Sequence, residues 1–216
     1  MSGAAGRRPT AEKKTLHAGE QERPDIVAAR AAWRAEVKGQ VDPDRLVFLD
    51  ESGLDTRLTR AYARAPAGQR AVGRVPGGNW RRLTILGAMA RDGLVAVMTV
   101  AAATSTAVFL AFIESVLIPA LRARPGTLVV MDNLAPHKAA CVRAALDRAG
   151  LEHRYLPAYS PDMNPIEPCW SKLKGDLRSA APRRIDALNN ALPSALNAIT
   201  PDDARAWFYH CGYRST

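Results

Sequence analysis

Three carboxylates in this sequence stand where they could act together on a phosphate group. Asp50 follows the apolar run Leu-Val-Phe-Leu, Asp132 follows Leu-Val-Val-Met, and Glu167 opens a predicted helix. The ends of buried strands hold charged groups rigidly at a solvent edge, so residues far apart in sequence can converge there. Oxygen ligands suit Mg²⁺ or Mn²⁺, and two such ions are the usual device for displacement at phosphorus. The trio is therefore a candidate metal site.

Each acid also has a purely structural interpretation. Asp50 and Asp132 are both followed by good turn chemistry. Glu167 comes three residues after Asn164, as in a capping box with Asn164 as the N-cap and Pro165 as the first helical residue. A charge at the end of a fully apolar strand is costly without a partner, which favours a functional role for Asp132.

The helix that Glu167 opens has two distinct faces. An apolar stripe that should pack on a sheet consists of Ile166, Trp170, Leu173 and Leu177. The neighbouring face carries Glu167, Ser171, Lys174 and Arg178. A carboxylate followed by two cations would place a metal ligand beside groups able to hold a phosphate backbone.

The charge of the chain indicates a polyanionic partner. A net charge of +9 and a pI near 9.9 favour nucleic acid. Residues 56–91 hold eight arginines and no acidic residue, which predicts a surface of one sign. The candidate DNA contacts are Arg57, Arg60, Arg64, Arg81, Arg82, Lys138, Lys172, Lys174 and Arg178.

Four further residues have weaker claims. Asn133 and His137 follow the second aspartate closely and are possible auxiliary residues that touch metal-bound water or substrate phosphate. Tyr159 and Trp80 are candidates for stacking on DNA bases, although such aromatics usually serve packing.

Cysteine usage and hydropathy narrow the class of protein. The three cysteines are widely spaced and form no C-x-x-C pair, which argues against a disulfide framework or a zinc site and fits a reducing cytoplasm. From Gly93 to Ile113 there are 21 residues without a charge. Polar Thr and Ser interrupt this run, and its pattern changes from β-rich to helical, so a buried strand followed by a buried helix is favoured over a membrane span.

The elements needed to position the acids can be read along the chain. Residues 1–40 form a polar linker or the remnant of an upstream DNA-binding region, with a helix over 26–37, and the body spans 41–216. Strands are expected at 45–50, 82–90, 94–100, 128–131 and 153–156. Helices are expected at 105–121, 137–149, 165–178 and 185–198. This order resembles the α/β ribonuclease-H-like fold, a mixed five-stranded sheet with helices on both faces.

The motifs around the acids carry a family resemblance. Phe-Leu-Asp-Glu-Ser-Gly around Asp50, Val-Met-Asp-Asn-Leu-Ala-Pro-His-Lys around Asp132, and Tyr-Ser-Pro-Asp-Met-Asn-Pro-Ile-Glu ending at Glu167 occur in this order. Together they resemble the DDE catalytic domain of bacterial insertion-sequence transposases of the mariner superfamily. The 34 residues between Asp132 and Glu167 are similar to the spacing in that group.

This resemblance implies cut-and-paste transposition. Asp50, Asp132 and Glu167 would be the catalytic residues and would hold two Mg²⁺ or Mn²⁺ ions for phosphodiester hydrolysis and strand transfer. The implied partner is double-stranded DNA, at transposon ends and target, bound by a homodimer in the bacterial cytoplasm and associated with the nucleoid. The 40 residues before the body are too few for the usual helix-turn-helix region, so a separately encoded helix-turn-helix subunit is a further expected partner.

Two other interpretations remain open at this point. The chain could be a catalytically silent DNA-binding remnant that regulates a full-length transposase, or another ribonuclease-H-like nuclease acting on RNA:DNA hybrids.

Overall fold

The computed structural model describes residues 18–60, 62–75, 77–78 and 81–214. Within these residues a five-stranded sheet has the order β3-β2-β1-β4-β5. Its strands are β1 (Leu46–Asp55), β2 (Arg82–Ala90), β3 (Gly93–Val100), β4 (Leu128–Met131) and β5 (Glu152–Tyr155). The pairs β1·β2 and β2·β3 are antiparallel, whereas β4 runs parallel to both β1 and β5. The mixed five-stranded sheet expected from the sequence is confirmed.

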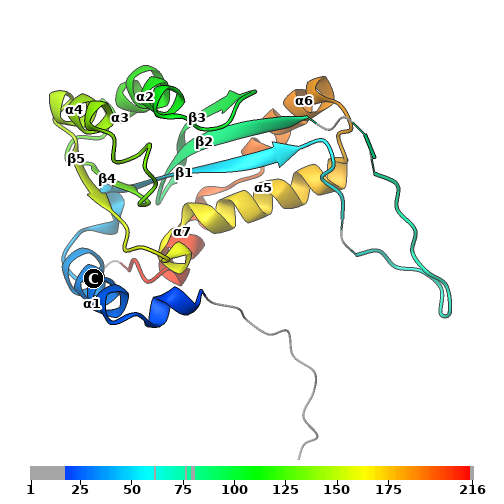
Figure 1. The fold of residues 1–216 in the computed structure, drawn as a ribbon, viewed down its shortest axis with the longest axis horizontal. Coiled ribbons are helices and arrows are strands. Elements are labelled where there is room, and N and C mark those ends of the chain that lie inside the picture. The colour runs from blue at the N-terminus through cyan, green and yellow to red at the C-terminus, as the bar shows by residue number, and fades with distance from the viewer. Residues whose placement is uncertain (1–17, 61, 76, 79–80, 215–216) are drawn as a thin grey trace, which may run out of the picture.

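Helices cover both faces of this sheet (Figure 1). One face packs against α1 (Pro24–Trp33), the π-helical turn η2 (Arg34–Lys38), α5 (Ile166–Ala180), α6 (Ile185–Asn197) and α7 (Pro201–His210). The other packs against α2 (Thr106–Phe112), the π-helical turn η4 (Ile113–Leu117), α3 (Ile118–Leu121) and α4 (Ala140–Arg148). Short 3₁₀ turns are η1 (Gly19–Glu22), η3 (Pro43–Arg45) and η5 (Pro161–Met163). The three-layer arrangement explains why all of β4 is buried.

Strand alternation divides the core between the two faces. Leu46 and Phe48 of β1 belong to the cluster under α5, whereas Val47 and Leu49 belong to the cluster under α2 and α4. The helix stripe expected from Ile166 to Leu177 is buried in the first cluster. Ser105 caps α2 by accepting a hydrogen bond from the backbone N–H of Val108, as its type and position predict.

The helix expected over 26–37 is present and is part of the core. Trp33 and Val37 are buried in the cluster under α5. The Trp33 indole N–H donates to the Tyr213 hydroxyl at 3.0 Å, and that hydroxyl donates to the backbone carbonyl of Met163 at 2.8 Å. The segment before residue 41 therefore links the chain's C-terminal residues to the loop before α5. Its role as a linker or remnant stays a prediction.

Two expected elements differ from the structure, and one helix was not expected. β1 continues past Asp50 to Asp55, because residues 51–55 pair with residues 82–86 of β2 and this ladder overrides their local turn chemistry. The helix expected from His137 begins only at Ala140, since residues 134–139 form turns. α7 was not expected, although Thr200 and Asp203 close a capping box at its start.

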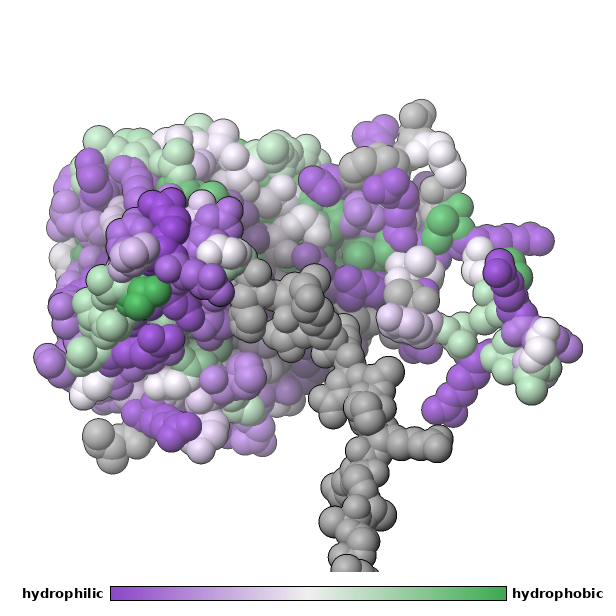
Figure 2. Space-filling model, turned by 60° about the horizontal axis from the view of Figure 1, so that its bottom comes forward, coloured by the Kyte–Doolittle hydropathy of each residue, from purple (hydrophilic) through white to green (hydrophobic). Residues whose placement is uncertain are grey.

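The described residues between β1 and β2 form an exposed arm. They extend away from the body (Figure 1), and every described residue from 62 to 78 is exposed. Figure 2 shows the arm standing clear of the rest of the molecule, with many hydrophilic side chains along it. Trp80, predicted to stack on bases, lies outside the described residues. Among the described residues, no helix is long and apolar enough to cross a membrane.

Candidate active site

The sheet register brings the two aspartates together. β1 and β4 pair in parallel from Leu46↔Leu128 to Phe48↔Val130. Asp50 and Asp132 each stand two residues beyond that last pair, so the extrapolated register places them side by side. Phe48 and Val130 both face the cluster under α5, and strand alternation points Asp50 to the same face.

Asp50 is buried against α5. Asp50 is only 8% exposed. Its Oδ2 accepts a hydrogen bond from the Trp170 indole N–H at 3.1 Å. Gly87 of β2 pairs with Asp50 and leaves room for that indole. A Cβ at Gly87 would lie 2.5 Å from Cη2 of Trp170, so no larger residue fits without moving the ring.

Glu167 enters the site from the first turn of α5, and its expected capping role is not observed. The cap position is taken by Pro165, with no side-chain hydrogen bond to the helix end. The Oδ1 of Asn164 is buried without a hydrogen-bond partner in the described structure. The capping-box interpretation of Glu167 is therefore wrong, and its carboxylate is free for another role.

One pocket of about 420 Å³ gathers the three acids. Its lining includes Asp50, Asp132, Asn133, Glu167 and residues 156–161. Asn133 donates a hydrogen bond from its side-chain amide to the Leu156 carbonyl, which ties the end of β4 to this loop. The pocket opens at the edge where β4 ends, as expected for a site built on parallel strands.

The acids repel one another in this pocket. Burial, followed by the negative charge of Glu167, raises the pKa of Asp50 to about 8. Partial burial and the charge of Asp132 raise the pKa of Glu167, and Lys174 opposes that rise. Carboxylates held in this way are stabilised in their charged form by a cation.

Asp132 differs because it has its own partners. Its Oδ1 accepts a hydrogen bond from the Leu134 backbone N–H at 3.0 Å. The same oxygen lies 2.5 Å from Nδ1 of His137, which is close enough for an ion pair but does not have the angle of a hydrogen bond. Burial would raise the pKa of Asp132, but His137 and the Leu134 N–H outweigh burial and lower it. Burial would lower the pKa of His137, but Asp132 and Glu51 raise it to about 9.

The chemistry of the donors fits a hard divalent cation, but the side chains do not converge fully. Asp50, Asp132 and Glu167 offer only carboxylate oxygens, as Mg²⁺ and Mn²⁺ prefer. In the described part of the chain, no group of three or more His, Cys, Asp or Glu side chains is arranged to hold an ion. One oxygen of Asp50 is engaged by Trp170 and one of Asp132 by His137. Metal binding therefore requires the remaining oxygens or a rotation of these side chains.

The loop that lines the pocket is held from α1. Arg30, which is 8% exposed, donates to both carboxylate oxygens of Asp162 at 3.0 and 2.7 Å and to the Ser160 hydroxyl at 2.7 Å. Gln21 donates to the Tyr159 carbonyl at 2.6 Å. Tyr159 has a φ of 55°, a left-handed conformation that costs about 1 kcal/mol for such a residue. These contacts fix the loop between β5 and Glu167.

The predicted DNA contacts fall into different settings. Lys172 is engaged with Asp203 of α7 at 2.5 Å, which indicates a structural ion pair. Lys138 lies over the Tyr155 ring at 5.7 Å. Arg60 donates to the Ser179 hydroxyl at the end of α5. The exposed arm and its base carry Arg57, Arg64, Arg81 and Arg82, while Lys174 and Arg178 lie half-buried along α5.

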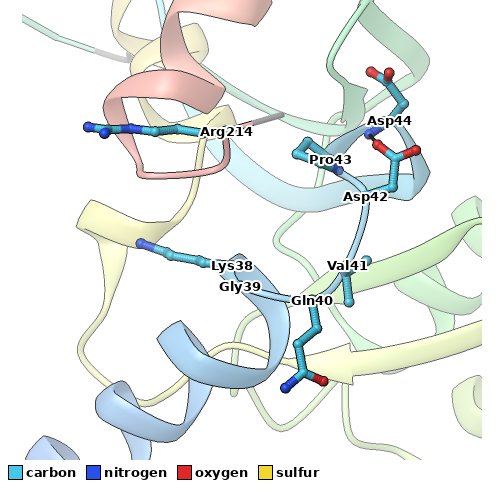
Figure 3. A pocket seen from close by; sticks show the side chains of 8 residues that line it. All are labelled: Lys38, Gly39, Gln40, Val41, Asp42, Pro43, Asp44 and Arg214. Atoms are coloured by element: carbon cyan, nitrogen blue, oxygen red, sulfur yellow. Dashed lines mark hydrogen bonds between the residues drawn. The ribbon is translucent and has the colours of Figure 1, made fainter. Parts of the chain in front are cut away.

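A second pocket, of about 390 Å³, lies before the start of β1 and contains none of Asp50, Asp132 and Glu167 (Figure 3). Lys38 and Arg214 extend away from Asp42 and Asp44 in this view. Lys38 already donates to the Cys211 carbonyl and lies over the Tyr213 ring, so this cation is engaged within the fold. The pocket that holds the acids is therefore the candidate active site.

Sequence reasoning missed the contacts that orient the acids. Trp170 was expected only to pack, and Glu51 was not singled out at all. The one available signal was position: Glu51 adjoins Asp50 on a strand, so its side chain must face the opposite side of the sheet.

Several solved structures of Mos1 transposase are similar to this chain. The chain in the Mos1 transposase paired-end complex with left transposon end matches with a TM-score of 0.77 at 18% identity, over 96% of this chain and 64% of that one. The Mos1 mariner paired end complex with Mn gives 0.75 at 17% identity over the same shares. The catalytic domain of Mos1 mariner transposase gives 0.63 at 15% identity, over 93% of each chain. The ribonuclease-H-like fold is confirmed, and the chain spans 64% of the Mos1 protein in the DNA complex.

The sequence itself gives the family. No curated protein sequence matches this chain. A family model described as DDE superfamily endonuclease matches residues 45–189, a range that contains Asp50, Asp132 and Glu167. Since that match spans more than half of the sequence, this chain belongs to the DDE superfamily endonuclease family.

Proposed function

We propose that this chain is the catalytic domain of a DNA transposase that cuts and rejoins phosphodiester bonds with divalent metal ions. The observation that carries the proposal is the pocket in which Asp50, Asp132 and Glu167 meet, from three separate elements of a DDE endonuclease fold. The similar Mos1 complexes, one of them with Mn, support it.

In this proposal the three acids bind two Mg²⁺ or Mn²⁺ ions. When bound, such ions activate a water or a DNA 3′-hydroxyl and stabilise charge on the phosphate. The protein's own part is positioning: Trp170 orients Asp50, the turn after β4 orients Asp132, and the first turn of α5 presents Glu167. Lys174, close enough to lower the pKa of Glu167, is placed to attract the phosphate backbone.

The DNA partner is proposed to be double-stranded, at transposon ends and target. The sequence of the exposed arm contains arginines and no acidic residue, and this composition suits phosphate contacts of low sequence specificity. We further propose that the chain works as a homodimer on DNA in the bacterial cytoplasm, with sequence reading supplied by a helix-turn-helix, whether separately encoded or not.

Plasmid nicking tests this function. The full chain is incubated with supercoiled DNA and Mg²⁺ or Mn²⁺, beside the same reaction with EDTA and with Asp132→Asn. Nicking that requires metal and is lost in the variant is expected, because Asp132 is a ligand. Equal nicking by Asp132→Asn contradicts the assignment, and preference for an RNA:DNA hybrid over duplex favours another nuclease. DNA binding with no nicking, combined with loss of transposition when the chain is added to a full-length transposase, favours a regulatory remnant.

A further inference from the structure

The backbone ladder alone does not fix the distance between Asp50 and Asp132. β1 and β4 pair over only three residues, and the last pair is Phe48↔Val130. Both acids lie beyond this pair, where β4 has already ended at Met131. A second connection between the two strands is therefore needed to hold one carboxylate against the other within the narrow tolerance of a metal site.

His137 supplies such a connection from the far face of the sheet. Its ring has no exposed surface and packs on Phe109 of α2, with ring centroids 4.0 Å apart. Its Nδ1 lies 2.5 Å from Oδ1 of Asp132, and its Nε2 lies 3.0 Å from Oε2 of Glu51. Tyr155 donates to the His137 carbonyl at 3.1 Å and so fixes the turn that carries the ring.

Glu51 ties this ring to the strand that bears Asp50. The two residues are neighbours on β1, so Asp50 faces the pocket under α5 while Glu51 faces α2 and α4. A chain of contacts thus runs from β1 through Glu51 and His137 to Asp132. It engages only Oδ1 of Asp132 and leaves Oδ2 with no hydrogen-bond partner among the described residues.

We infer that Glu51 and His137 act as a pair of positioning residues that set the Asp132 carboxylate for metal binding. This inference rests on the proposed function, because it assigns Asp132 as a ligand. Neither residue lines the pocket that holds the three acids, so their effect on a metal ion bound there would pass through Asp132. Outer partners that orient a metal ligand typically change metal affinity about 10–100-fold when they are removed.

The simpler alternative is that His137 is a buried core residue whose loss only weakens the fold. The two interpretations differ in how the residues couple. If Glu51 acts on Asp132 through His137, removing Glu51 from a chain that already carries His137→Phe has little further effect on metal affinity. Independent contributions to stability would add.

The test measures Mn²⁺ binding to the full chain by calorimetry, at one pH. The variants are His137→Phe, which keeps a ring against Phe109, Glu51→Ala, their combination, and Glu51→Gln, whose amide oxygen still accepts a hydrogen bond. His153→Phe is the matched control, since His153 lies on β5 outside the pocket. Thermal unfolding and metal-free DNA binding are recorded for each.

His137→Phe and Glu51→Ala are each expected to bind Mn²⁺ about 10–100-fold more weakly, and the double variant no more weakly than His137→Phe. Glu51→Gln and His153→Phe should remain within a few-fold of the wild type, and metal-free DNA binding should not change. Wild-type Mn²⁺ affinity in both single variants, or additive losses, overturns the inference while the proposed function stands. If His137→Phe fails to fold, the Mn²⁺ affinity of Glu51→Ala is compared with that of Glu51→Gln, and equal affinities of these two variants overturn the inference. A wild-type chain that binds no Mn²⁺ removes the proposed function and this inference together.

Discussion

Gly87→Ala should show how tightly the buried aspartate is packed. The new Cβ would stand 2.5 Å from Cη2 and 2.9 Å from Cζ2 of Trp170, whereas ordinary contacts begin near 3.4 Å. Trp170 is only 2% exposed, so its indole has little free space around it. The indole must therefore move by about 1 Å or force β2 to move. Overpacking of this kind costs about 1–3 kcal/mol, and the loss of glycine's freedom in the unfolded chain offsets about 0.4–1 kcal/mol.

The net expectation is a loss of about 1–2 kcal/mol, or a drop in melting temperature of roughly 2–8 °C for a chain of this size. Moving Trp170 also displaces the N–H that holds Asp50, so Mn²⁺ binding should weaken as well. Circular dichroism melting and calorimetry measure the two effects.

Two variants sharpen this experiment. Gly175→Ala in α5 meets nothing within 4 Å, so the same substitution there should stabilise the chain by about 0.5–1 kcal/mol. Trp170→Phe removes the atoms that clash with the new Cβ, so the two substitutions at Gly87 and Trp170 together should cost less than their sum. A Gly87→Ala chain that melts at or above the wild-type temperature, or strict additivity with Trp170→Phe, would refute the packing argument.

Three further expectations concern charged groups. Arg30→Ala should cost about 1–3 kcal/mol in urea unfolding, with only partial recovery in Arg30→Lys. The hydrogen bonds from Arg30 lower the pKa of Asp162, so this difference should be present above about pH 4 and fade as the pH falls further; a difference that grows in acid contradicts it. Lys174→Gln should reduce the slope of DNA affinity against salt concentration by about one unit. Lys172→Gln should mainly lower the melting temperature, because it breaks an ion pair with Asp203 of α7. The reverse pattern would place the DNA on the other side of α5. Since burial and Glu167 raise the pKa of Asp50 to about 8, this group costs the metal-free fold stability as the pH rises from about 4 through 8. Asp50→Asn should thus melt at a higher temperature than the wild type at pH 8, and the Mn²⁺ affinity of the wild type should increase between pH 6 and pH 8. Equal melting temperatures and an Mn²⁺ affinity that does not change with pH would contradict a raised pKa of Asp50.

Elements with a strong local pattern were predictable from the sequence. The fully apolar run of β4 and the stripe of α5 were both located, because burial on a sheet dictates which residue types repeat and how often. The extension of β1 was not predictable, since residues 51–55 look like a turn until they pair with β2, which is separated from the end of β1 by 26 residues. The missed helix α7 had a readable start in Thr200, Pro201 and Asp203.

The meeting of the three acids in one pocket was predictable, whereas their partners in the fold were not. Order and spacing single out Asp50, Asp132 and Glu167 through their resemblance to the family motifs, although Asp50 lies within β1 and not at its end. The contacts of Trp170 with Asp50 and of Glu51 with His137 depend on sheet register and side-chain rotamers. Those are properties of the folded chain that no local window contains. The capping interpretation of Glu167 failed for the same reason, since it considered only four consecutive residues.

A crystal of the full chain soaked in Mn²⁺, with anomalous diffraction at the manganese edge, tests the central claim most directly. We expect Mn²⁺ in the pocket, with carboxylate oxygens of at least two of Asp50, Asp132 and Glu167 within about 2.0–2.3 Å, and we expect no Mn²⁺ there in crystals of Asp132→Asn. Strong manganese density elsewhere with an empty pocket, or undiminished density in the variant, would contradict the account.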